Sequence, residues 1–431
     1  MLEALQRALA IPELKRRITF VLTMFLIFAI GAHIPVPGID HNKLAAIMRG
    51  GAGNLLGLVD VFSGGALRRM STFAMGIGPY INASIIMQMM TIALPQLDAL
   101  SKEGESGRKQ IAKITRYLTI LLAVVQSFSM TFILSQSGVS LPFFQRVQIC
   151  IALTAGSMFL LWLGEQVTQH GVGNGVSLVI FAGILLSLPY QIGLIAKQLE
   201  AHTVSVLSLL ILIAAFVGTV YAIVYITQGT RRIPIQHAKR VVGMRQTQAG
   251  ASYLPIKVNT AGVIPIIFAI SLMLLPATLF NTIPIQTGFI GWLKEKAMYL
   301  SPGQSPIALL FYALLVIVFT YFYTAIVMNV QEMSDNLKKY GNYIPGIRPG
   351  KATHDYLERV ISRITLAGAV FLAVIAALQY LIPQWTGFQT FTLIGGTSLL
   401  IVVGVAIETM QAIEAQLLMR NYEGFIRNPK G

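Results

Sequence analysis

The sequence predicts an all-α membrane protein with ten transmembrane helices, arranged as two inverted halves of five helices each. Hydrophobic residues make up 55% of its 431 residues, charged residues only 11%, and the mean hydropathy is +0.69. A soluble domain of this size could not cover so much apolar surface. Crossing a hydrocarbon core of about 30 Å takes about 20 helical residues. We expect such segments at 18–34, 70–94, 117–135, 147–164, 174–195, 204–227, 258–280, 306–328, 364–382 and 391–413.

A polar amphipathic segment, residues 1–17, precedes the first apolar run. That run is long enough to span, so we expect it to stay in the mature protein rather than to be cleaved as a signal peptide. If the N-terminus is cytoplasmic, 24 of the 32 Lys and Arg residues fall on the cytoplasmic side. Basic residues favour cytoplasmic loops. We therefore expect both termini, including the tail 414–431, in the cytoplasm.

The ten predicted spans divide into residues 18–200 and residues 201–413. Since five is an odd number, the second half enters the membrane from the side opposite to the first. This is the pattern of an inverted repeat. Each half also has a long connector after its first span, at 35–69 and 228–257. Two halves of this kind can meet around a central path.

The first connector contains an apolar segment, residues 58–69, that is too short to span and is interrupted by Ser63, Gly64 and Gly65. Irregular backbone at membrane depth is stable only when protein or a water-filled cavity surrounds it. We therefore predict a short re-entrant helix here, entering from the outer face, and a cavity that receives it. An interfacial hairpin without a gating role is the alternative.

Two predicted cytoplasmic loops concentrate positive charge. Residues 329–363 mix six basic with four acidic residues and contain NYIPGIRPG, in which proline and glycine flank Arg348. These neighbours restrict the backbone, so we expect a stiff turn that presents the Arg348 guanidinium to an acidic surface or to RNA phosphate. Residues 228–257 contain no Asp or Glu. Their basic residues are Arg231, Arg232, Lys239, Arg240, Arg245 and Lys257.

No combination of residues is typical of an enzyme or a metal site. Cys150 is the only cysteine, which excludes a disulfide framework and a cysteine-based zinc site. The six histidines are scattered, without HExxH spacing or a Ser/His/Asp grouping. The glycine-rich GVGNGVS, residues 171–177, lacks the GK[ST] of a phosphate loop. We therefore expect no catalytic residues, no metal ligands and no cofactor.

Charged residues are almost absent from the predicted spans. Glu408 lies near the cytoplasmic end of the last span, and Glu165 lies where the fourth span ends. A secondary transporter of a small neutral solute is the second interpretation of this chain, and an intramembrane enzyme is the third. Ion-coupled transporters usually carry charged groups at midplane, so their absence counts against the transporter. The lack of a nucleophile and base counts against the enzyme.

Six longer motifs follow one another along the chain. They are FSGGALRRMSTFAMGIGPYINASII, KEGESGRKQIAKITRY, MFLLWLGEQVTQHGVGNGVSLVIFAGI, LPIKVNTAGVIPIIFA, DNLKKYGNYIPGIRPGKAT and GGTSLLIVVG. Together they resemble the bacterial SecY family of protein-secretion channel subunits, and the resemblance runs from the first span to the C-terminal tail. It implies a central hourglass pore that passes unfolded preproteins outward. It also implies that the pore opens sideways to lipid between the second, third, seventh and eighth spans.

The resemblance assigns residues to four parts of such a channel. The pore ring is Ile77, Ile81, Val176, Ile180, Ile267 and Ile401. The plug is Leu58, Val59, Asp60, Val61, Phe62, Ser63, Gly64, Gly65, Ala66, Leu67, Arg68 and Arg69. The lateral gate includes Asn82 and Gln126, and the docking residues are Arg231, Arg232, Lys239, Arg240, Arg245 and Arg348. A ring of aliphatic side chains dewets and resists ions because it offers no hydrogen bonds. Ordinary helix packing is the alternative role for these isoleucines.

The same resemblance implies partners and a location. The small membrane subunits SecE and SecG assemble with such a chain, and the motor ATPase SecA or the ribosome, through its RNA phosphates, docks on the basic loops. Signal peptides and unfolded preproteins are the implied substrates, and the lipid bilayer receives hydrophobic segments. The implied location is the bacterial cytoplasmic membrane. Because the chain has no nucleotide site, the work of transport must come from a partner, from translation or from the membrane potential.

Overall fold

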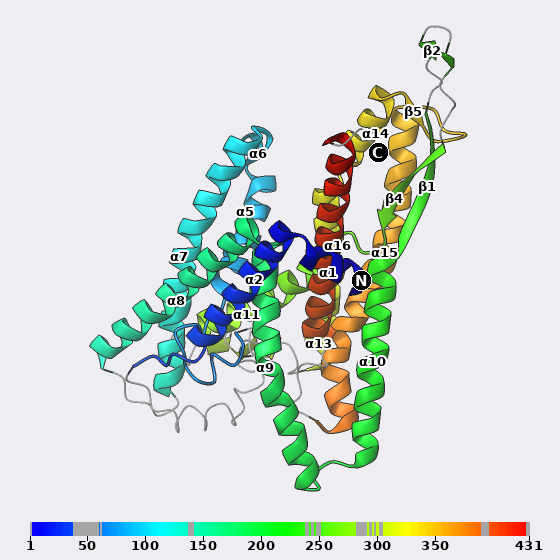
Figure 1. Cartoon of the computed structure of the whole chain (residues 1–431). Helices are drawn as coiled ribbons and strands as arrows, with labels where there is room; N and C mark the ends of the chain where they lie inside the picture. The colour runs from blue at the N-terminus through cyan, green and yellow to red at the C-terminus, as the bar shows by residue number, and fades with distance from the viewer. Residues whose placement is uncertain are drawn as a thin grey trace.

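Long helices in two consecutive sets make up most of the fold (Figure 1). The computed structural model describes residues 2–37, 60, 63–136, 142–237, 241–242, 245–246, 251–281, 291–292, 295–296, 299–300, 305–388 and 396–427. The first set is α1 (Leu2–Ala10), α2 (Pro12–Gly31), α5 (Gly78–Ala93), α6 (Pro95–Lys102), α7 (Glu105–Gln136), α8 (Phe143–His170) and α9 (Gly175–Glu200). The second set is α10 (Val206–Gln228), α11 (Ile264–Asn281), α13 (Pro306–Val327), α14 (Val330–Lys339), α15 (Lys351–Thr386) and α16 (Gly396–Arg427). Each of the ten predicted spans overlaps one of these helices.

Several helices of this fold are long and apolar enough to cross a membrane, so the protein is a multi-pass membrane protein. Among the described residues, seven helices are long and apolar enough to cross a membrane, namely α7, α8, α9, α10, α13, α15 and α16. Helices α5 and α6 would add an eighth span if they are counted together. The apolar part of α11, Ile264–Met273, is shorter, and α2 carries Lys15, Arg16 and Arg17 near its start. The count of ten spans therefore stays a prediction.

The second predicted span begins at Gly78 instead of residue 70. Met70 and Gly76 have φ angles of 45° and 56°, which lie in the left-handed region that a right-handed helix does not contain. Most residues from 66 to 77 therefore form turns. At the other end, Leu94 precedes Pro95 and is extended, with φ −106° and ψ 116°. This break separates α5 from α6, and the chain bends by 99° between the two helices.

Side-chain caps fix the starts of several other helices. Asn174 Oδ1 accepts hydrogen bonds from the backbone N–H groups of Val176 at 3.0 Å and Ser177 at 3.3 Å, and so caps α9. Ser205 caps α10 and Ser305 caps α13 in the same way. The first residues of α9, α10 and α13 are thus each fixed by a side-chain cap.

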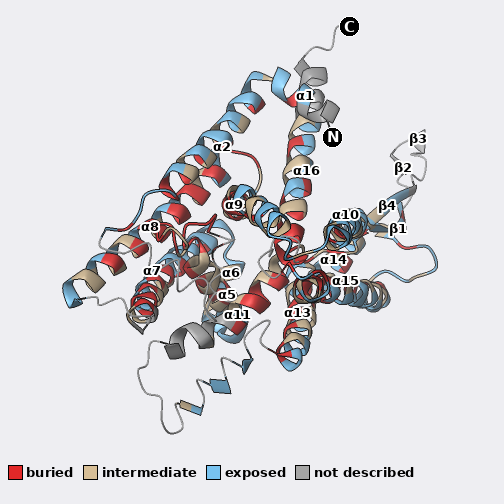
Figure 2. Cartoon of the chain, turned by 90° about the horizontal axis from the view of Figure 1, so that it is seen from below, coloured by how far each residue is buried: buried red, intermediate tan, exposed pale blue. Residues whose placement is uncertain are grey.

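The two helix sets pack against each other across one apolar core. Helix α11 of the second set contacts α5 and α7 of the first, and α16 contacts α9. The largest buried cluster joins Phe28 and Ile77 of the first set to Phe268 and Phe319 of the second. Figure 2 shows buried residues on the inward sides of the helices and exposed residues along the outer sides. The core therefore lies between the two halves of the chain.

The two basic loops form a small sheet, which we did not predict. Strand β1 (Thr230–His237) pairs antiparallel with β4 (Ala251–Lys257), and β5 (Asn342–Tyr343) pairs with the other edge of β1. Strands β2 (Val241–Val242) and β3 (Arg245–Gln246) form a separate short pair. Ile233 and Ile256, each 2% exposed, pack in one cluster with Ile344 and with Leu357 of α15. The sheet therefore joins both loops to α15.

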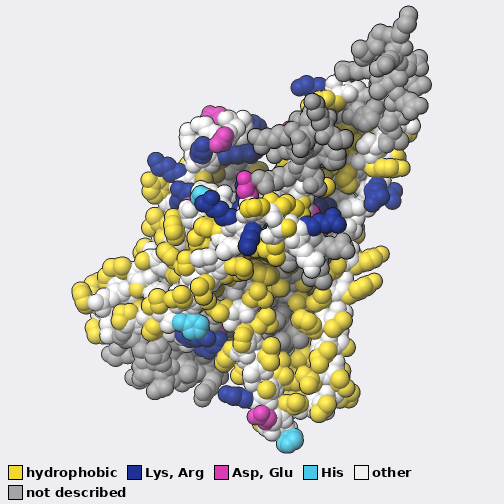
Figure 3. All heavy atoms as spheres, in the orientation of Figure 1, with side chains coloured by type: hydrophobic (Ala, Val, Ile, Leu, Met, Phe, Trp, Pro, Cys, Tyr) yellow, Lys and Arg dark blue, Asp and Glu magenta, His cyan; other side chains and the backbone are white. Residues whose placement is uncertain are grey.

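Charged and apolar side chains separate along the length of the molecule. On the face drawn in Figure 3, hydrophobic side chains cover a broad middle zone, and most Lys and Arg side chains lie above it. In Figure 1 the same end of the molecule carries α6 and the sheet. A smaller charged group lies at the opposite end. This distribution suits an apolar zone that lies in a bilayer, with the more basic end facing the cytoplasm.

Candidate functional site

The six predicted ring residues come from four regions of the chain that meet in the core. Ile77 and Ile81 lie at the start of α5, Val176 and Ile180 in the first turns of α9, Ile267 in α11 and Ile401 in α16. All six belong to the largest apolar cluster. Ile77, Ile180 and Ile401 are 6%, 5% and 1% exposed, and the other three are partly buried. The cluster therefore contains ring residues from both halves, and in the same core α11 contacts α5 while α16 contacts α9.

The plug segment is described at Asp60 and from Ser63 onward, whereas Leu58, Val59, Val61 and Phe62 lie outside the described residues. Residues 63–69 form turns rather than the regular helix that we predicted. Gly64 and Gly65 cause this difference, since their φ angles are 74° and 77°. The Ser63 hydroxyl donates to the Asp60 carbonyl at 3.1 Å, and the Gly65 N–H donates to it at 2.8 Å.

The segment after the plug is tied to the end of α2. The Val36 N–H donates to the Met70 carbonyl at 2.9 Å, and the Thr72 N–H donates to the Ile34 carbonyl at 3.1 Å. Leu67 and Met70 pack in a second buried cluster with Ala74 of the following turns, Val36 beyond the end of α2, and residues of α7 and α8. The described plug residues are therefore enclosed by the first helix set.

One side of the plug segment lies against α9. A Cβ atom placed on Gly64 would come within 3.2 Å of the Gly183 carbonyl oxygen, so the two backbones approach closely. The Arg68 guanidinium lies over the ring of Tyr190, with 3.2 Å from its central carbon to the ring centroid. We did not identify Tyr190 from the sequence. An aromatic residue directly after Pro189 inside a span was the only local signal.

The two predicted gate residues lie on adjacent helices. Asn82 on α5 and Gln126 on α7 are both partly buried. Helices α5 and α7 pack closely on each other, and α11 contacts both. The boundary that the resemblance assigns to the lateral gate is therefore a closed helix contact in this structure. Arg116 Nε of α7 donates to Glu165 Oε1 of α8 at 2.8 Å, which ties α7 to its neighbour in the first set.

Three of the six predicted docking residues lie on the sheet or on the turn that follows it. Arg231 and Arg232 are exposed on β1, and Arg348 is exposed between β5 and α15. Arg245 lies in β3 without a described side-chain position, and Lys239 and Arg240 lie outside the described residues. Since β1 pairs with β5, the arginines of both loops belong to one folded unit. The Tyr343 hydroxyl reinforces that unit by donating to Gln236 Oε1 at 3.0 Å.

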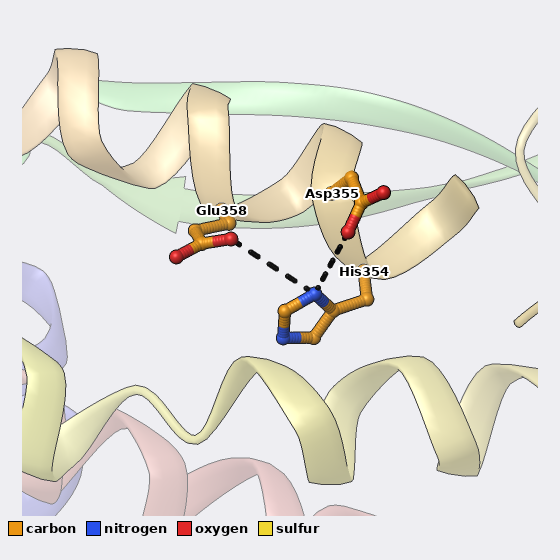
Figure 4. Close-up of side chains that lie close together, drawn as sticks. All are labelled: His354, Asp355 and Glu358. Carbon is orange, nitrogen blue, oxygen red and sulfur yellow. Dashed lines mark hydrogen bonds and ion pairs between the residues drawn. The ribbon is translucent and has the colours of Figure 1, made fainter. Parts of the chain in front are cut away.

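An exposed polar cluster lies at the start of α15 (Figure 4). His354 Nδ1 is 3.3 Å from Asp355 Oδ1 and 4.0 Å from Glu358 Oε2. The Asp355 and Glu358 side chains are 51% and 67% exposed. Asp355 and Glu358 are two of the four acidic residues of the second basic loop, whereas the first basic loop has none. Their contacts are local to one helix turn, and we assign no ligand to them.

The fold defines a class of protein: a multi-pass helical membrane protein with an apolar core between two helix sets and a basic folded unit at one end. The sequence profile of the SecY family matches residues 71–410. Protein translocase subunit SecY of Thermotoga maritima is 42% identical, over 100% of this chain and 99% of that protein. The Bacillus subtilis subunit of the same name is 41% identical, over 99% of this chain and 100% of that protein. The chain belongs to the SecY family.

Solved structures show the same fold. A protein-conducting channel matches with a TM-score of 0.66 and 20% identity, covering 93% of this chain and 92% of that one. A SecY structure, whose plug domain is reported to stabilise the closed channel and maintain a membrane seal, matches with a TM-score of 0.68 and 21% identity over the same shares. Sec61 in the canine ribosome-channel complex matches with a TM-score of 0.63 and 19% identity, also over those shares. As a SecY-family member, this chain is a protein translocase channel subunit and not an enzyme.

Proposed function

We propose that this chain is the ten-span channel of a bacterial cytoplasmic membrane, with both termini in the cytoplasm. Its hourglass pore passes unfolded preproteins outward, is closed by the six-residue ring and the plug, and releases hydrophobic segments into lipid between α5 and α7 on one side and α11 and α13 on the other. One observation carries this proposal: the six predicted ring residues, from both halves, belong to a single buried apolar cluster.

The chemistry of these six side chains suits a seal that opens. Aliphatic side chains give water and ions no hydrogen-bonding partner, so a narrow passage between them dewets. Their contacts across the two halves are dispersion contacts without fixed direction, which a passing peptide of any sequence can replace. Ion pairs in that position would instead select for particular peptide charges. An aliphatic ring therefore suits a channel with many substrates.

The contact of α11 with α5 and α7 supports the proposed lateral gate. Separating α11 from these two helices would open the core toward lipid without breaking a covalent connection, since the two sets are joined elsewhere along the chain. Asn82 and Gln126 are partly buried polar residues of the two helices that α11 contacts. Polar groups at membrane depth favour a wet or protein-lined surface over lipid. A signal peptide that enters there would replace the contact with its own apolar helix.

The folded basic unit is proposed as the docking surface for SecA or the ribosome, with RNA phosphates as the ribosomal ligand. A ribosome complex is known for the related Sec61 channel. SecE and SecG are proposed as the accompanying membrane subunits. The sheet that carries the exposed arginines packs on α15, and the sheet and this helix share one buried cluster. Binding of a partner at these arginines can therefore shift α15, which contains a predicted span.

Replacement of ring side chains tests the proposed seal. Changing Ile77, Ile81 and Ile180 to Gly removes three of the six side chains, and we expect the resting ion conductance of the reconstituted complex in a planar bilayer to rise by at least about tenfold. Glycine also weakens the helices themselves by about 1 kcal/mol each. A matched control changes Ile151, Ile192 and Ile307 to Gly, since these side chains are 64%, 59% and 58% exposed on the outer surface. Equal conductance in the two triple variants would remove the ring assignment.

A further inference from the structure

The Arg68 side chain is the most constrained charged group of the plug segment. Its backbone N–H donates to Asp60 Oδ1 at 2.7 Å, and its Nη2 lies 3.6 Å from Asp60 Oδ2. The Arg68 and Asp60 side chains are only 19% and 10% exposed. The same guanidinium lies over the Tyr190 ring, with its central carbon 3.2 Å from the ring centroid. Arg68 therefore connects its own segment to α9.

Two glycines make this arrangement possible. A Cβ atom on Gly65 would lie 2.5 Å from Arg68 Nη2, so any larger residue there would displace the guanidinium. A Cβ atom on Gly64 would press on the Gly183 backbone and on Leu186, both of α9. The backbone of the plug segment thus lies directly against the backbone of α9 at Gly64 and Gly183. The Arg68 side chain adds a second contact with α9, at Tyr190.

Tyr190 has the position and chemistry to hold the segment in place. It lies ten residues beyond Ile180 on α9, which is about 15 Å along the helix toward the outer face. A planar guanidinium stacks on an aromatic face better than an ammonium does. Because Arg68 is largely removed from water, this attraction is stronger than at an open surface.

We propose that Tyr190 is a positioning residue for the plug: its ring holds Arg68, and through it residues 63–69, against α9 in the closed state. This inference rests on the proposed plug function. The contact is reversible, since it involves one aromatic face and one side chain, so the segment can leave when the channel opens. Asp60 Oδ2, 3.6 Å from Arg68 Nη2, compensates the charge of the same guanidinium.

The experiment measures plug exposure directly. In a Cys150→Ser background, Ser63→Cys places one thiol in the plug segment at a position that is 1% exposed. The full complex in proteoliposomes is treated from outside with a small alkylating reagent. We expect Tyr190→Leu to raise the alkylation rate about 3- to 30-fold, which is the population change expected for a cation–π contact between a largely buried guanidinium and a ring that is 45% exposed. Tyr190→Phe keeps the aromatic face and should change the rate less than about twofold.

Two further variants test specificity. Arg68→Lys keeps the charge near Asp60 but loses the planar stack, and it should raise the alkylation rate toward that of Tyr190→Leu. Tyr221→Leu removes an aromatic residue of α10 that is 71% exposed and stacks on Tyr225, and it should have no effect. Equal rates for Tyr190→Leu and the parent would overturn the inference. So would equal increases for the Leu and Phe variants, or for Tyr221→Leu.

Conductance of the same samples separates this inference from the proposed function. If Tyr190→Leu raises both alkylation and resting ion conductance, the contact and the sealing role of the plug are both supported. If alkylation rises and conductance does not, Tyr190 still positions the segment, but the segment does not seal the channel. If conductance rises without faster alkylation, Tyr190 acts on the pore by another route and the inference is wrong.

Discussion

At the scale of single residues, Arg348 shows how local sequence presents a side chain that we propose for docking. Gly346 and Gly350 take φ angles of 81° and 102°, which non-glycine residues rarely adopt. The Thr353 hydroxyl donates to the Arg348 carbonyl at 2.9 Å, and the Ser334 hydroxyl donates to the Gly350 carbonyl at 3.0 Å. These hydrogen bonds hold the backbone of the turn, so the exposed guanidinium can change without changing the fold.

Charge reversal at this turn tests the proposed docking of SecA. We expect Arg348→Glu to lower SecA-driven transport of a preprotein into vesicles by at least about tenfold, because the proposal pairs this guanidinium with an acidic surface, which a carboxylate would repel. Thermal unfolding of the complex should be unchanged, since the side chain is exposed. Arg363→Glu, an equally exposed reversal on α15, is the matched control. Full transport by the Arg348 variant would refute the docking role.

The Arg348 turn could be predicted because its causes lie within a few residues of it. Proline and glycine on both sides are visible in the sequence and restrict the same backbone. Tyr190 could not be predicted in this way. Its contact with Arg68 depends on Gly64, Gly65 and Gly183, which bring two distant segments together. A single sequence gives no signal for such a pairing.

At the scale of elements, α8 crosses the turns that follow the plug at a position where only glycine fits. A Cβ atom on Gly156 would collide with the carbonyl group of Thr72 and would lie 3.3 Å from the Phe73 ring. Phe73 in turn stacks between Phe28 and Phe159, with centroids 6.0 and 5.8 Å away. The backbone of Thr72 therefore packs directly on α8 at Gly156, and the rings of Phe28, Phe73 and Phe159 pack beside this contact. A shift of the Thr72 backbone would displace α8 as well.

Gly156→Ala should destabilise the protein through this crossing. Overfilling a tightly packed site typically costs about 1–3 kcal/mol, because the carbonyl cannot rotate away as a side chain would. We expect a lower midpoint for thermal unfolding of the detergent-solubilised protein. Gly218→Ala on α10 is the control, since no atom lies within 4 Å of a Cβ there. The control should leave the midpoint unchanged or raise it slightly. Equal midpoints for both variants would show that α8 does not pack on Thr72.

The elements differ in how far the sequence predicts them. Apolar runs predicted every long helix, because hydrophobicity summed over some twenty residues outweighs local detail. The start of α5 was wrong by eight residues because Met70 and Gly76 have left-handed backbone angles that no apolar pattern reveals. The sheet was missed because Pro234, Pro255 and the arginines make its strands look like loop. The alternate isoleucines Ile233 and Ile235, which are buried on β1, were the signal available in the sequence.

At the scale of the whole molecule, the two halves are held together by an apolar core that also contains the proposed pore ring. Helix α11 closes on α5 and α7, and α16 closes on α9. The same side chains therefore stabilise the closed fold and form the proposed seal. Opening must exchange these contacts for contacts with a substrate, which suits a channel that stays shut until a hydrophobic segment arrives.

The inverted repeat requires five spans in each half, and within the second half α11 is the helix on which that number depends. Its described apolar part is short, yet α10, α11 and α13 must all cross if the count is ten.

Single cysteines in a Cys150→Ser background can report on which side of the membrane each connection lies. Suitable positions are Glu103 between α6 and α7, Ala201 between α9 and α10, and Tyr340 after α14, all exposed. A membrane-impermeant maleimide should label Glu103→Cys and Tyr340→Cys from the cytoplasmic side and Ala201→Cys from outside. Labelling of Tyr340→Cys on the same side as Ala201→Cys would mean that α11 does not cross, and the inverted arrangement would then be wrong.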